Sequence, residues 1–425
     1  MGRIVHLGLG NFHRAHQAWY TARAGGDWCI TGVAMTRPDL RDALAPAGFA
    51  YTLAIQGPDG VTRTPMRVHD RVLVLPEDPD AVIRAIADPA THIVTLTVTE
   101  KGYGFGHDGQ LDLAHPAIAA DLAGTTPQSA IGVLTRGLMA RAMSGRPITL
   151  ISCDNIGNNG RKLRAGILRF AQAAGADLGD YMQMRVGCPN TMVDRITPAT
   201  TDALRREIGE PAPVLTEAFS EWVIEDTFTT PRPDWAAAGA VITQDVAPFE
   251  MRKLHLLNAA HSLLAYGGLL RGHSHVHEAM ADPVLARAVA GLWDEATAIV
   301  PADIHDTLPA YRRALDARFA VAAMRHRLDQ IAMDGSQKMP VRIIPILKAR
   351  LARDDGAPQA IFAIAAWLAY LARGDIAPDP AAAPLAGGLP EKVMERGLHL
   401  LGLSEMSHPC KSDLESCFQR FASHR

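Results

Sequence analysis

The stretch "RIVHLGLGNFHRAH", residues 3–16, decides the fold expected for this chain. Its opening run Ile4-Val5-His6-Leu7 is mostly apolar and β-branched and predicts a strand, and the residues after the glycines predict a helix. A glycine turn between a first strand and a helix can hold a dinucleotide pyrophosphate on backbone N–H groups. The bulky His13 occupies the third glycine position of that pattern, so the helix should pack differently from the standard dinucleotide fold. The residues predicted to bind the cofactor are Gly8, Gly10, Asn11, Phe12, His13 and Arg14.

Further along the chain, apolar β-branched runs alternate with helical stretches. A second strand is predicted at "WCITGVAM" (28–35), followed by a helix over about 37–47. The runs "HIVTLTVTE" (92–100) and "PITLISCDN" (147–155) each follow a helical stretch, at 78–88 and 129–143. Strands that alternate with helices predict an α/β fold with a parallel, doubly wound sheet. Polar residues end both runs, at the edge where ligands bind in open α/β sheets.

The character of the chain changes near residue 248, where Ala- and Leu-rich helical segments begin. We therefore expect a dinucleotide-binding domain over residues 1–245 and a mostly helical substrate and catalytic domain over 246–425. In the second domain only "VRIIPIL" (341–347) resembles a strand. The segment "APDPAAAPLAGGLP" (377–390) is rich in Pro and Gly and predicts a flexible surface loop.

Composition excludes several classes of function. The 425 residues are 48% hydrophobic and 20% charged, with a formal net charge of −3 and no basic run, so nothing favours binding to nucleic acid or a membrane surface. Five widely spaced cysteines without a CxxC pair suit a reducing compartment without disulfides or structural zinc. The early strand and the lack of a stretch of about 20 apolar residues predict a soluble, cytoplasmic protein without a signal peptide.

The stretch "KLHLLNAAHS" (253–262) places polar groups where a helix should bury leucines. At about 100° per residue, Glu250, Lys253, Asn258 and His261 fall within an arc of about 140°. Burial lowers the pKa of a lysine, so Lys253 is a candidate general base. The alternative is that Lys253 reaches solvent and His261 is a satisfied core histidine. Helix geometry alone leaves both interpretations open.

Six segments together resemble the mannitol dehydrogenase family, the polyol-specific long-chain dehydrogenases. They occur in order over about residues 4–345, and the Lys-x4-Asn-x2-His spacing is that family's catalytic signature. The resemblance implies a zinc-independent NAD(P)-dependent oxidoreductase with an N-terminal Rossmann-like domain and a largely helical C-terminal domain. The segments are "GLGNFHRAH" (8–16), "TVTEKGY" (97–103), "SCDNIGNNG" (152–160), "CPNTMVDRITP" (188–198), "KLHLLNAAH" (253–261) and "MDGSQK" (333–338).

The resemblance also implies a role for each matching residue. Lys253 is the general acid and base, and Asn258 and Asn155 are amide donors to the reacting oxygen. His261 orients the substrate, and Glu250 guards the proton path to Lys253. Asp194, Arg195 and Lys338 match substrate-binding positions, although a neighbouring acid and base such as Asp194 and Arg195 are as often a surface ion pair.

Two positions favour one branch of the family. Lys101 stands where mannitol dehydrogenases typically have glycine, and Gln330 stands where they have an arginine. Both resemble fructuronate reductases, and an extra cation at Lys101 suits a sugar acid. The resulting hypothesis is an NAD-dependent enzyme that interconverts D-fructuronate and D-mannonate. The alternatives are a mannitol or arabinitol 2-dehydrogenase and a catalytically silent nucleotide-binding protein.

Three further questions are the choice between NAD and NADP, the oligomeric state and a possible metal site. No carboxylate stands at the expected end of the second strand, and Arg37 could meet a 2′-phosphate, so NADP is not excluded. The oligomeric state is not predicted. The run "HSHVHE" (273–278) resembles a metal site, but no other Cys or His cluster accompanies it and the family needs no metal, so we expect none.

Overall fold

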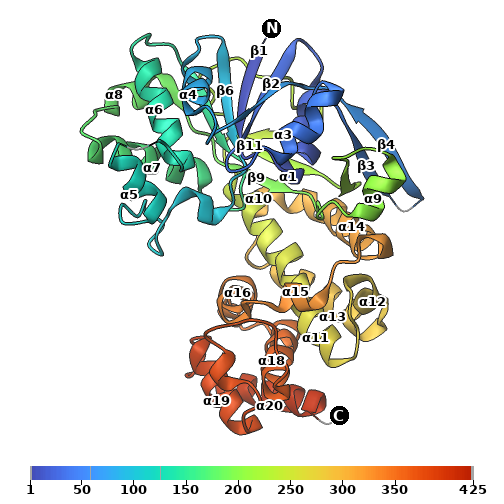
Figure 1. Cartoon of the computed structure of the whole chain (residues 1–425). Helices are drawn as coiled ribbons and strands as arrows, with labels where there is room; N and C mark the ends of the chain where they lie inside the picture. The colour runs from blue at the N-terminus through green and yellow to red at the C-terminus, as the bar shows by residue number, and fades with distance from the viewer. Residues whose placement is uncertain (1, 58, 125, 423–425) are drawn as a thin grey trace. The chain divides into compact units, whose positions relative to one another are not determined.

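The computed structural model describes residues 2–57, 59–124 and 126–422. The chain divides into two compact units, Met1–Ala247 and Pro248–Arg425 (Figure 1). Among the described residues, no helix has both the length and the apolar character needed to cross a membrane.

The N-terminal unit is built around a six-stranded sheet in which every neighbouring pair of strands is parallel. The strand order is β5-β2-β1-β6-β7-β8, so the chain starts at the centre and builds outward in both directions. This order confirms the predicted doubly wound sheet. The strands are β1 (Gly2–Leu7), β2 (Trp28–Ala34), β5 (His69–Val74), β6 (Thr91–Leu96), β7 (Ile148–Ser152) and β8 (Val186–Gly187).

Each face of the sheet buries its own core, because side chains alternate along a strand. On one face, Val5, Val94 and Leu150 pack with residues of α4 (Pro79–Ala87), α6 (Ala130–Ala142) and α7 (Asn159–Ala173). On the other face, Ile4 and Ile93 pack with α2 (Gln17–Ala24) and with two small sheets. The continuous apolar character of these strands therefore has a direct structural cause.

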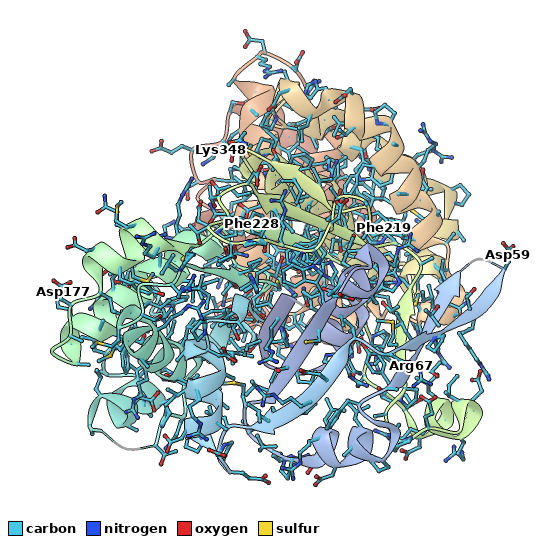
Figure 2. The ribbon with its side chains drawn as sticks, turned by 90° about the horizontal axis from the view of Figure 1, so that it is seen from above. Asp59, Arg67, Asp177, Phe219, Phe228 and Lys348 are labelled. Carbon is cyan, nitrogen blue, oxygen red and sulfur yellow. The ribbon has the colours of Figure 1, made fainter. Side chains whose placement is uncertain are left out.

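The two small sheets were not predicted from the sequence. One has the order β10-β3-β4 and the other β12-β11-β9. Asp59 lies at the outer end of the β3–β4 hairpin (Figure 2). The strands are β3 (Tyr51–Gly57), β4 (Gly60–Met66), β9 (Thr191–Asp194), β10 (Val214–Glu217), β11 (Glu221–Glu225) and β12 (Val241–Thr243).

The single helix predicted after the glycine turn is two helices, because the backbone leaves helical geometry at His16 (φ −119°, ψ −87°). The imidazole Nε2 of His16 lies 3.0 Å from the carbonyl oxygen of Glu221 in β11. This contact ties the break to one of the small sheets. The remaining helices of the unit are α1 (Asn11–Ala15), α3 (Asp39–Leu44), α5 (Pro116–Leu122), α8 (Gly179–Arg185) and α9 (Asp202–Ile208).

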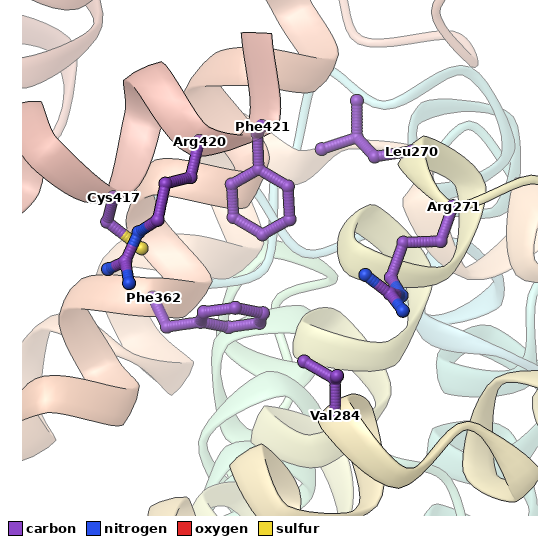
Figure 3. Close-up of a pocket in the computed structure, with 7 residues that line it drawn as sticks. All are labelled: Leu270, Arg271, Val284, Phe362, Cys417, Arg420 and Phe421. Carbon is purple, nitrogen blue, oxygen red and sulfur yellow. The ribbon is translucent and has the colours of Figure 1, made fainter. Parts of the chain in front are cut away.

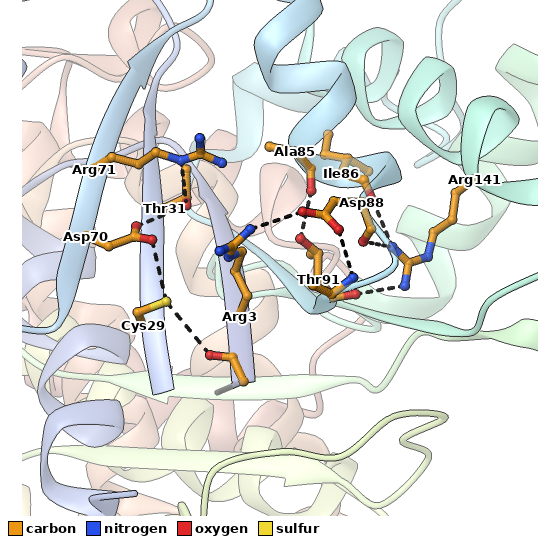
Figure 4. Close-up of polar contacts among 12 residues, drawn as sticks. Arg3, Cys29, Thr31, Asp70, Arg71, Ala85, Ile86, Asp88, Thr91 and Arg141 are labelled. Atoms are coloured by element: carbon orange, nitrogen blue, oxygen red, sulfur yellow. Dashed lines mark hydrogen bonds and ion pairs between the residues drawn. The ribbon is translucent and has the colours of Figure 1, made fainter. Parts of the chain in front are cut away.

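The guanidinium of Arg141, at the end of α6, joins three backbone segments, and Figure 4 shows its bonds to two of them. Its Nη1 donates to the carbonyl oxygens of Ile86 and Asp88, at 3.1 and 2.5 Å. Its Nη2 donates to those of Thr91 and Pro147, both at 2.8 Å. These bonds hold the end of α4 and the starts of β6 and β7 around one buried cation.

The C-terminal unit is helical throughout its described residues, with α11 and α18 buried along most of their length. The possible strand at 341–347 is wrong: the segment forms the end of α16 and the start of α17, where a proline occupies the first turn. The helices are α10 (Ala247–Arg252), a π-helix (Lys253–Asn258), α11 (Ala259–Leu270), α12 (Val276–Ala281), α13 (Pro283–Ala296), α14 (Leu308–Phe319), α15 (Leu328–Ala332), α16 (Gly335–Arg342), α17 (Ile344–Leu351), α18 (Pro358–Arg373), α19 (Pro390–Leu400) and α20 (His408–Ala422).

We predict that Arg141→Met lowers the free energy of unfolding by about 3 kcal/mol, because buried carbonyls lose charge-assisted donors. Urea unfolding of the full chain measures the change. Arg146→Met is the matched control, since Arg146 lies five residues away with an exposed side chain. A change within about 0.5 kcal/mol for Arg141→Met, as expected for a surface position, would contradict the prediction.

Candidate active site

The glycine turn after β1 has a different requirement at each glycine. Gly8 has φ +94°, and a Cβ there would lie 2.1 Å from the carbonyl oxygen of Thr97. Gly10 is different, because the nearest atom to a Cβ placed there would be the Gly8 carbonyl oxygen at 3.7 Å. No protein contact therefore demands glycine at position 10. The open space fits the close approach of a pyrophosphate to the backbone.

The side chains of the turn contact protein rather than open space. Arg14 is buried and donates to the carbonyl oxygen of Ala212 at 2.6 Å and to Oδ1 of Asn11 at 2.7 Å. Nδ2 of Asn11 in turn donates to Oγ1 of Thr200 at 3.0 Å, and the ring of Phe12 stacks on that of His16. These side chains are engaged by protein groups, so the backbone of the turn is the part suited to bind a ligand.

His13 belongs to a buried chain of three imidazoles beneath the turn. Its ring stacks on His6, with 3.4 Å between centroids, and its Nε2 lies 3.0 Å from Nε2 of His69. Nε2 of His6 lies 2.9 Å from Oγ1 of Thr97 and 3.3 Å from the carbonyl oxygen of Gly8. Burial lowers the pKa of His6 and of His69 to about 3 and that of His13 well below its ordinary value. All three rings are therefore neutral at pH 7.

Arg37, the candidate contact for a 2′-phosphate, lies three residues beyond β2 and is ion-paired with Asp39. Both side chains are exposed. Asp39 lies five residues beyond the end of β2, so the pair does not place a carboxylate at the strand end itself, where an NAD-binding sheet carries one.

The loop that follows β6 is held by Asp154, a residue that sequence reasoning did not single out. Its carboxylate accepts from the backbone N–H groups of Val98 and Thr99, both at 2.9 Å, and from the hydroxyl of Tyr103 at 2.7 Å. Thr99 has φ +65°, which explains why the predicted strand ends early at Leu96. Lys101 is exposed on this loop. Asn155 is exposed next to Asp154, beyond the end of β7.

Asn159, in the same motif as Asn155, is structural. Its Nδ2 donates to the carbonyl oxygens of Ser152 and Thr191, at 3.1 and 2.9 Å, and its Oδ1 accepts from the N–H of Thr191 at 2.9 Å. These bonds join the end of β7 to β9. The motif "SCDNIGNNG" holds several asparagines, and no residue pattern within it shows that the side chain of Asn159 is used for structure.

Asp194 and Arg195 are both buried in the N-terminal unit. The guanidinium of Arg195 donates to the carbonyl oxygens of Ala15 and Glu217 and lies 4.7 Å from the ring centroid of Trp19. These contacts give Arg195 a structural role between α1 and the small sheet that contains β10. Because both side chains are buried, the two residues are not a surface ion pair. Their expected role in substrate binding stays a prediction.

Lys253 begins the C-terminal unit's π-helix, which ends at Asn258. The N–H of Ala259 donates to the carbonyl oxygen of Leu254, the i→i−5 bond of a π-helix. The expectation of a continuous α-helix over 253–262 is therefore wrong, and the arc calculated at 100° per residue does not describe these side chains. Lys253 and Asn258 are half-buried, as is Glu250 in α10.

His261 is buried in α11 among aromatic and cationic side chains. Its ring lies 5.0 Å from those of Phe319 and His326, measured between centroids. Burial lowers the pKa of His261 well below its ordinary value, and His326, Arg318, Arg342 and Lys338 lower it further. The ring is neutral at pH 7, and the charged groups that act on it are cations.

The "DGS" residues before Lys338 fix the start of its helix, α16. Asp334 has φ +54°, and a Cβ on Gly335 would lie 2.3 Å from the hydroxyl of Tyr266. Ser336 donates from its N–H at 2.7 Å to the carboxylate of Asp379, which is buried. The segment 377–390, expected to be a flexible surface loop, thus contributes a buried anchor for this helix. Nζ of Lys338 donates to the carbonyl oxygen of Ile331 at 3.2 Å.

The sequence interpretation did not single out Arg342, which contacts the segment that carries Lys253 and Asn258. It lies one helical turn after Lys338, on the same side of α16, and this i, i+4 spacing was the available signal. Its Nη1 lies 3.3 Å from the carbonyl oxygen of Asn258.

The histidine-rich run at 273–278 caps helices. Nδ1 of His275 lies 3.2 Å from Oε1 of Glu278, which also accepts backbone N–H bonds at the start of α12. Nε2 of His273 lies 3.2 Å from Oδ2 of Asp282 at the start of α13. Over the described parts of the chain, no group of three or more His, Cys, Asp or Glu side chains is arranged to hold a metal.

A cavity of about 610 Å³ lies elsewhere in the C-terminal unit (Figure 3). None of the predicted site residues lines it, so it is distinct from the candidate active site. Its lining residues are Leu270, Arg271, Val284, Phe362, Cys417, Arg420 and Phe421.

Comparison with known proteins matches residues 2–237 to the mannitol dehydrogenase Rossmann domain and residues 245–385 to the mannitol dehydrogenase C-terminal domain. The chain is 38% identical to the D-mannonate oxidoreductase of Escherichia coli, over 87% of this chain and 79% of that protein. It is 39% identical to the D-arabinitol 4-dehydrogenase of Ralstonia nicotianae, over 82% and 79%. The mannitol 2-dehydrogenase of Pseudomonas fluorescens, solved with NAD and D-mannitol, superposes with a TM-score of 0.79 and 32% identity, over 99% of this chain and 91% of that one.

The buried imidazoles predict how stability depends on pH. His6 and His69 bind a proton in the unfolded chain below about pH 6.5 but in the folded unit only near pH 3, so the unfolded state gains protons first as pH falls. The contribution of each histidine should be complete only well above pH 6.5, and it should fall by about 1 kcal/mol between pH 7 and 5.5.

Hydrogen exchange of the β1 and β6 amides at these two pH values measures the effect in the N-terminal unit. His69→Gln should weaken the pH dependence, whereas His107→Gln should not, because His107 is exposed. An unchanged dependence in His69→Gln would show that the buried cluster does not control acid stability.

Proposed function

Because the chain belongs to the mannitol dehydrogenase family of oxidoreductases, we propose that it interconverts D-fructuronate and D-mannonate with NAD as the cofactor. The observation that supports the choice of substrate is the half-buried Lys338 on α16, in the unit that holds the proposed general base. Its Nζ donates to a main-chain oxygen, that of Ile331, at 3.2 Å.

A sugar-acid substrate carries a carboxylate that the ammonium of Lys338 can bind. D-fructuronate differs from D-fructose mainly by a carboxylate remote from the reacting carbonyl, and a charge-assisted hydrogen bond to it contributes about 1.5–3 kcal/mol. Burial followed by the nearby Arg342 lowers the pKa of the Lys338 ammonium, while Asp334 and Asp379 act in the opposite direction. A bound carboxylate would favour the charged ammonium further. Lys338 is therefore our first candidate for the carboxylate partner, with the exposed Lys101 as the second.

The residues of the glycine turn fit a dinucleotide. The open space above Gly10 suits the pyrophosphate, and Gly8 keeps the turn against Thr97. When bound, the cofactor supplies or accepts the hydride. The mannitol 2-dehydrogenase of Pseudomonas fluorescens, to which this chain is 32% identical, was solved with NAD, and this supports NAD as the cofactor. The exposed Arg37–Asp39 pair carries both charges and favours neither NAD nor NADP.

Lys253 is proposed to transfer the proton to and from the reacting oxygen. In carbonyl reduction its ammonium donates to the forming alkoxide, and in alcohol oxidation its neutral amine accepts the hydroxyl proton. We propose that the amide of Asn258 donates to the same oxygen, an interaction worth about 3 kcal/mol in comparable oxyanion holes. Asn155 is proposed as a second amide donor and Glu250 as the residue through which protons reach Lys253. A neutral His261 can hydrogen-bond a substrate hydroxyl without adding charge.

Lys253→Ala should lower kcat by at least about a hundredfold, because general acid–base catalysis contributes about that much or more. Affinity for NADH, measured by fluorescence titration, should stay unchanged, and small primary amines should restore part of the rate. The control is Lys348→Ala, an exposed lysine of α17. Wild-type turnover and pH profile in the Lys253 variant would exclude the lysine from proton transfer.

We expect the wild-type enzyme to reduce D-fructuronate with a much higher kcat/KM than D-fructose. Lys338→Met and Lys101→Met, measured on both substrates, should identify the carboxylate partner. The variant that removes this partner should lower the ratio of kcat/KM for D-fructuronate to that for D-fructose by about tenfold to a hundredfold, and it should leave the rate with D-fructose unchanged. Lys348→Met is the control. If both variants affect the two substrates equally, neither lysine binds the carboxylate.

One observation favours a second candidate, a polyol dehydrogenase. Identity to the D-arabinitol 4-dehydrogenase is as high as identity to the D-mannonate oxidoreductase. A wild-type preference for fructose or another uncharged ketose in the same assay would select this candidate. Tight NADH binding without turnover of any ketose or keto-acid would instead indicate a catalytically silent protein.

A further inference from the structure

The π-helix Lys253–Asn258 carries the proposed base at its first residue and an amide donor at its last. A π-helix shifts backbone hydrogen bonds from the i→i−4 pattern, and such segments occur frequently at functional sites. Side chains of two neighbouring helices contact carbonyl oxygens of this segment.

Arg342 contacts the segment at two points. Its Nη1 lies 3.3 Å from the carbonyl oxygen of Asn258 and 3.2 Å from Oγ of Ser262, which itself donates to the same carbonyl at 3.2 Å. In the other direction, the carbonyl oxygen of Arg342 lies 3.2 Å from Nδ1 of His255. The end of α16 is thus bonded both to the middle and to the last residue of the π-helix.

A tryptophan holds the same segment from another helix. Nε1 of Trp293, in α13, donates to the carbonyl oxygen of Leu256 at 3.0 Å, and the indole is buried. Two helices therefore supply donors to backbone oxygens between Lys253 and Asn258. Since α16 also carries Lys338, Arg342 links the proposed carboxylate partner to the segment with the proposed base.

We infer that Arg342 is a positioning residue that, together with Trp293, holds the π-helix in the conformation that aims Lys253 and Asn258 at the reacting oxygen. The inference rests on the proposed roles of Lys253 and Asn258 but not on the identity of the substrate. Arg342 acts through the backbone, so its loss should affect the chemical step for a charged and an uncharged substrate alike.

The test measures kcat and KM for D-fructuronate and D-fructose in Arg342→Met and Trp293→Phe. Misplacing a catalytic group by about 1 Å costs about a hundredfold in rate, so we expect kcat to fall about tenfold to a hundredfold in Arg342→Met, equally for every substrate that the wild type turns over. Trp293→Phe keeps the ring but loses the N–H, and its kcat should fall in the same way by a smaller factor. NADH affinity should not change in either variant.

Arg353→Met is the matched control, because this exposed arginine also donates to a backbone carbonyl of the same unit, that of Ala298, but far along the chain from the π-helix. A rise in KM for D-fructuronate alone would make Arg342 a substrate ligand and overturn the inference. A lower melting temperature with wild-type kcat would also overturn it, since the role would be structural only. A wild type that reduces only uncharged ketoses would refute the proposed substrate, while the kcat comparison would still test Arg342.

Discussion

The approach of Gly8 to the carbonyl oxygen of Thr97 fixes the ligand edge of the N-terminal unit. A Cβ at position 8 would lie 2.1 Å from that oxygen, so a larger residue would separate the ends of β1 and β6, the two central strands. The hydroxyl of Thr97 donates to the Gly8 carbonyl at 2.9 Å, and the imidazole of His6 reaches both groups. One close contact thus joins the central strands and leaves the backbone at Gly10 open to a ligand.

The C-terminal unit also has an irregular backbone segment, a π-helix rather than a glycine turn. Side chains hydrogen-bond to backbone carbonyl oxygens in both segments: Arg342 and Trp293 at the π-helix, Thr97 and His6 at the glycine turn. Buried polar networks of this kind are costly when incomplete, and a complete one specifies a single arrangement. Each candidate site therefore depends on side chains that need not touch a ligand.

The sequence predicted the parallel sheet because β-branched runs flanked by helices leave few alternatives, and the strands at 28–35, 92–100 and 147–155 correspond to β2, β6 and β7. It did not predict the two small sheets. The strands β9 to β12 have only three to five residues each, but β3 and β4 have seven each and were missed although the sequence has a Pro-Asp-Gly turn signal at their junction. It also could not show that Arg195 is satisfied by carbonyl oxygens, because main-chain acceptors leave no mark in a sequence. The π-helix was missed for a related reason: "KLHLLNAAHS" fits an α-helical pattern, and the extra residue in the turn depends on Arg342, 84 positions after Asn258.

Burial changes which ionisable groups of the C-terminal unit can carry a proton at neutral pH. The chain has 17 histidines, and histidine is the usual acid–base residue near neutral pH. The pKa of His261, however, lies well below its ordinary value, because the ring is buried and faces His326, Arg318, Arg342 and Lys338. A protonated His261 would add a positive charge to a cationic site, so this residue cannot hold a transferable proton at pH 7.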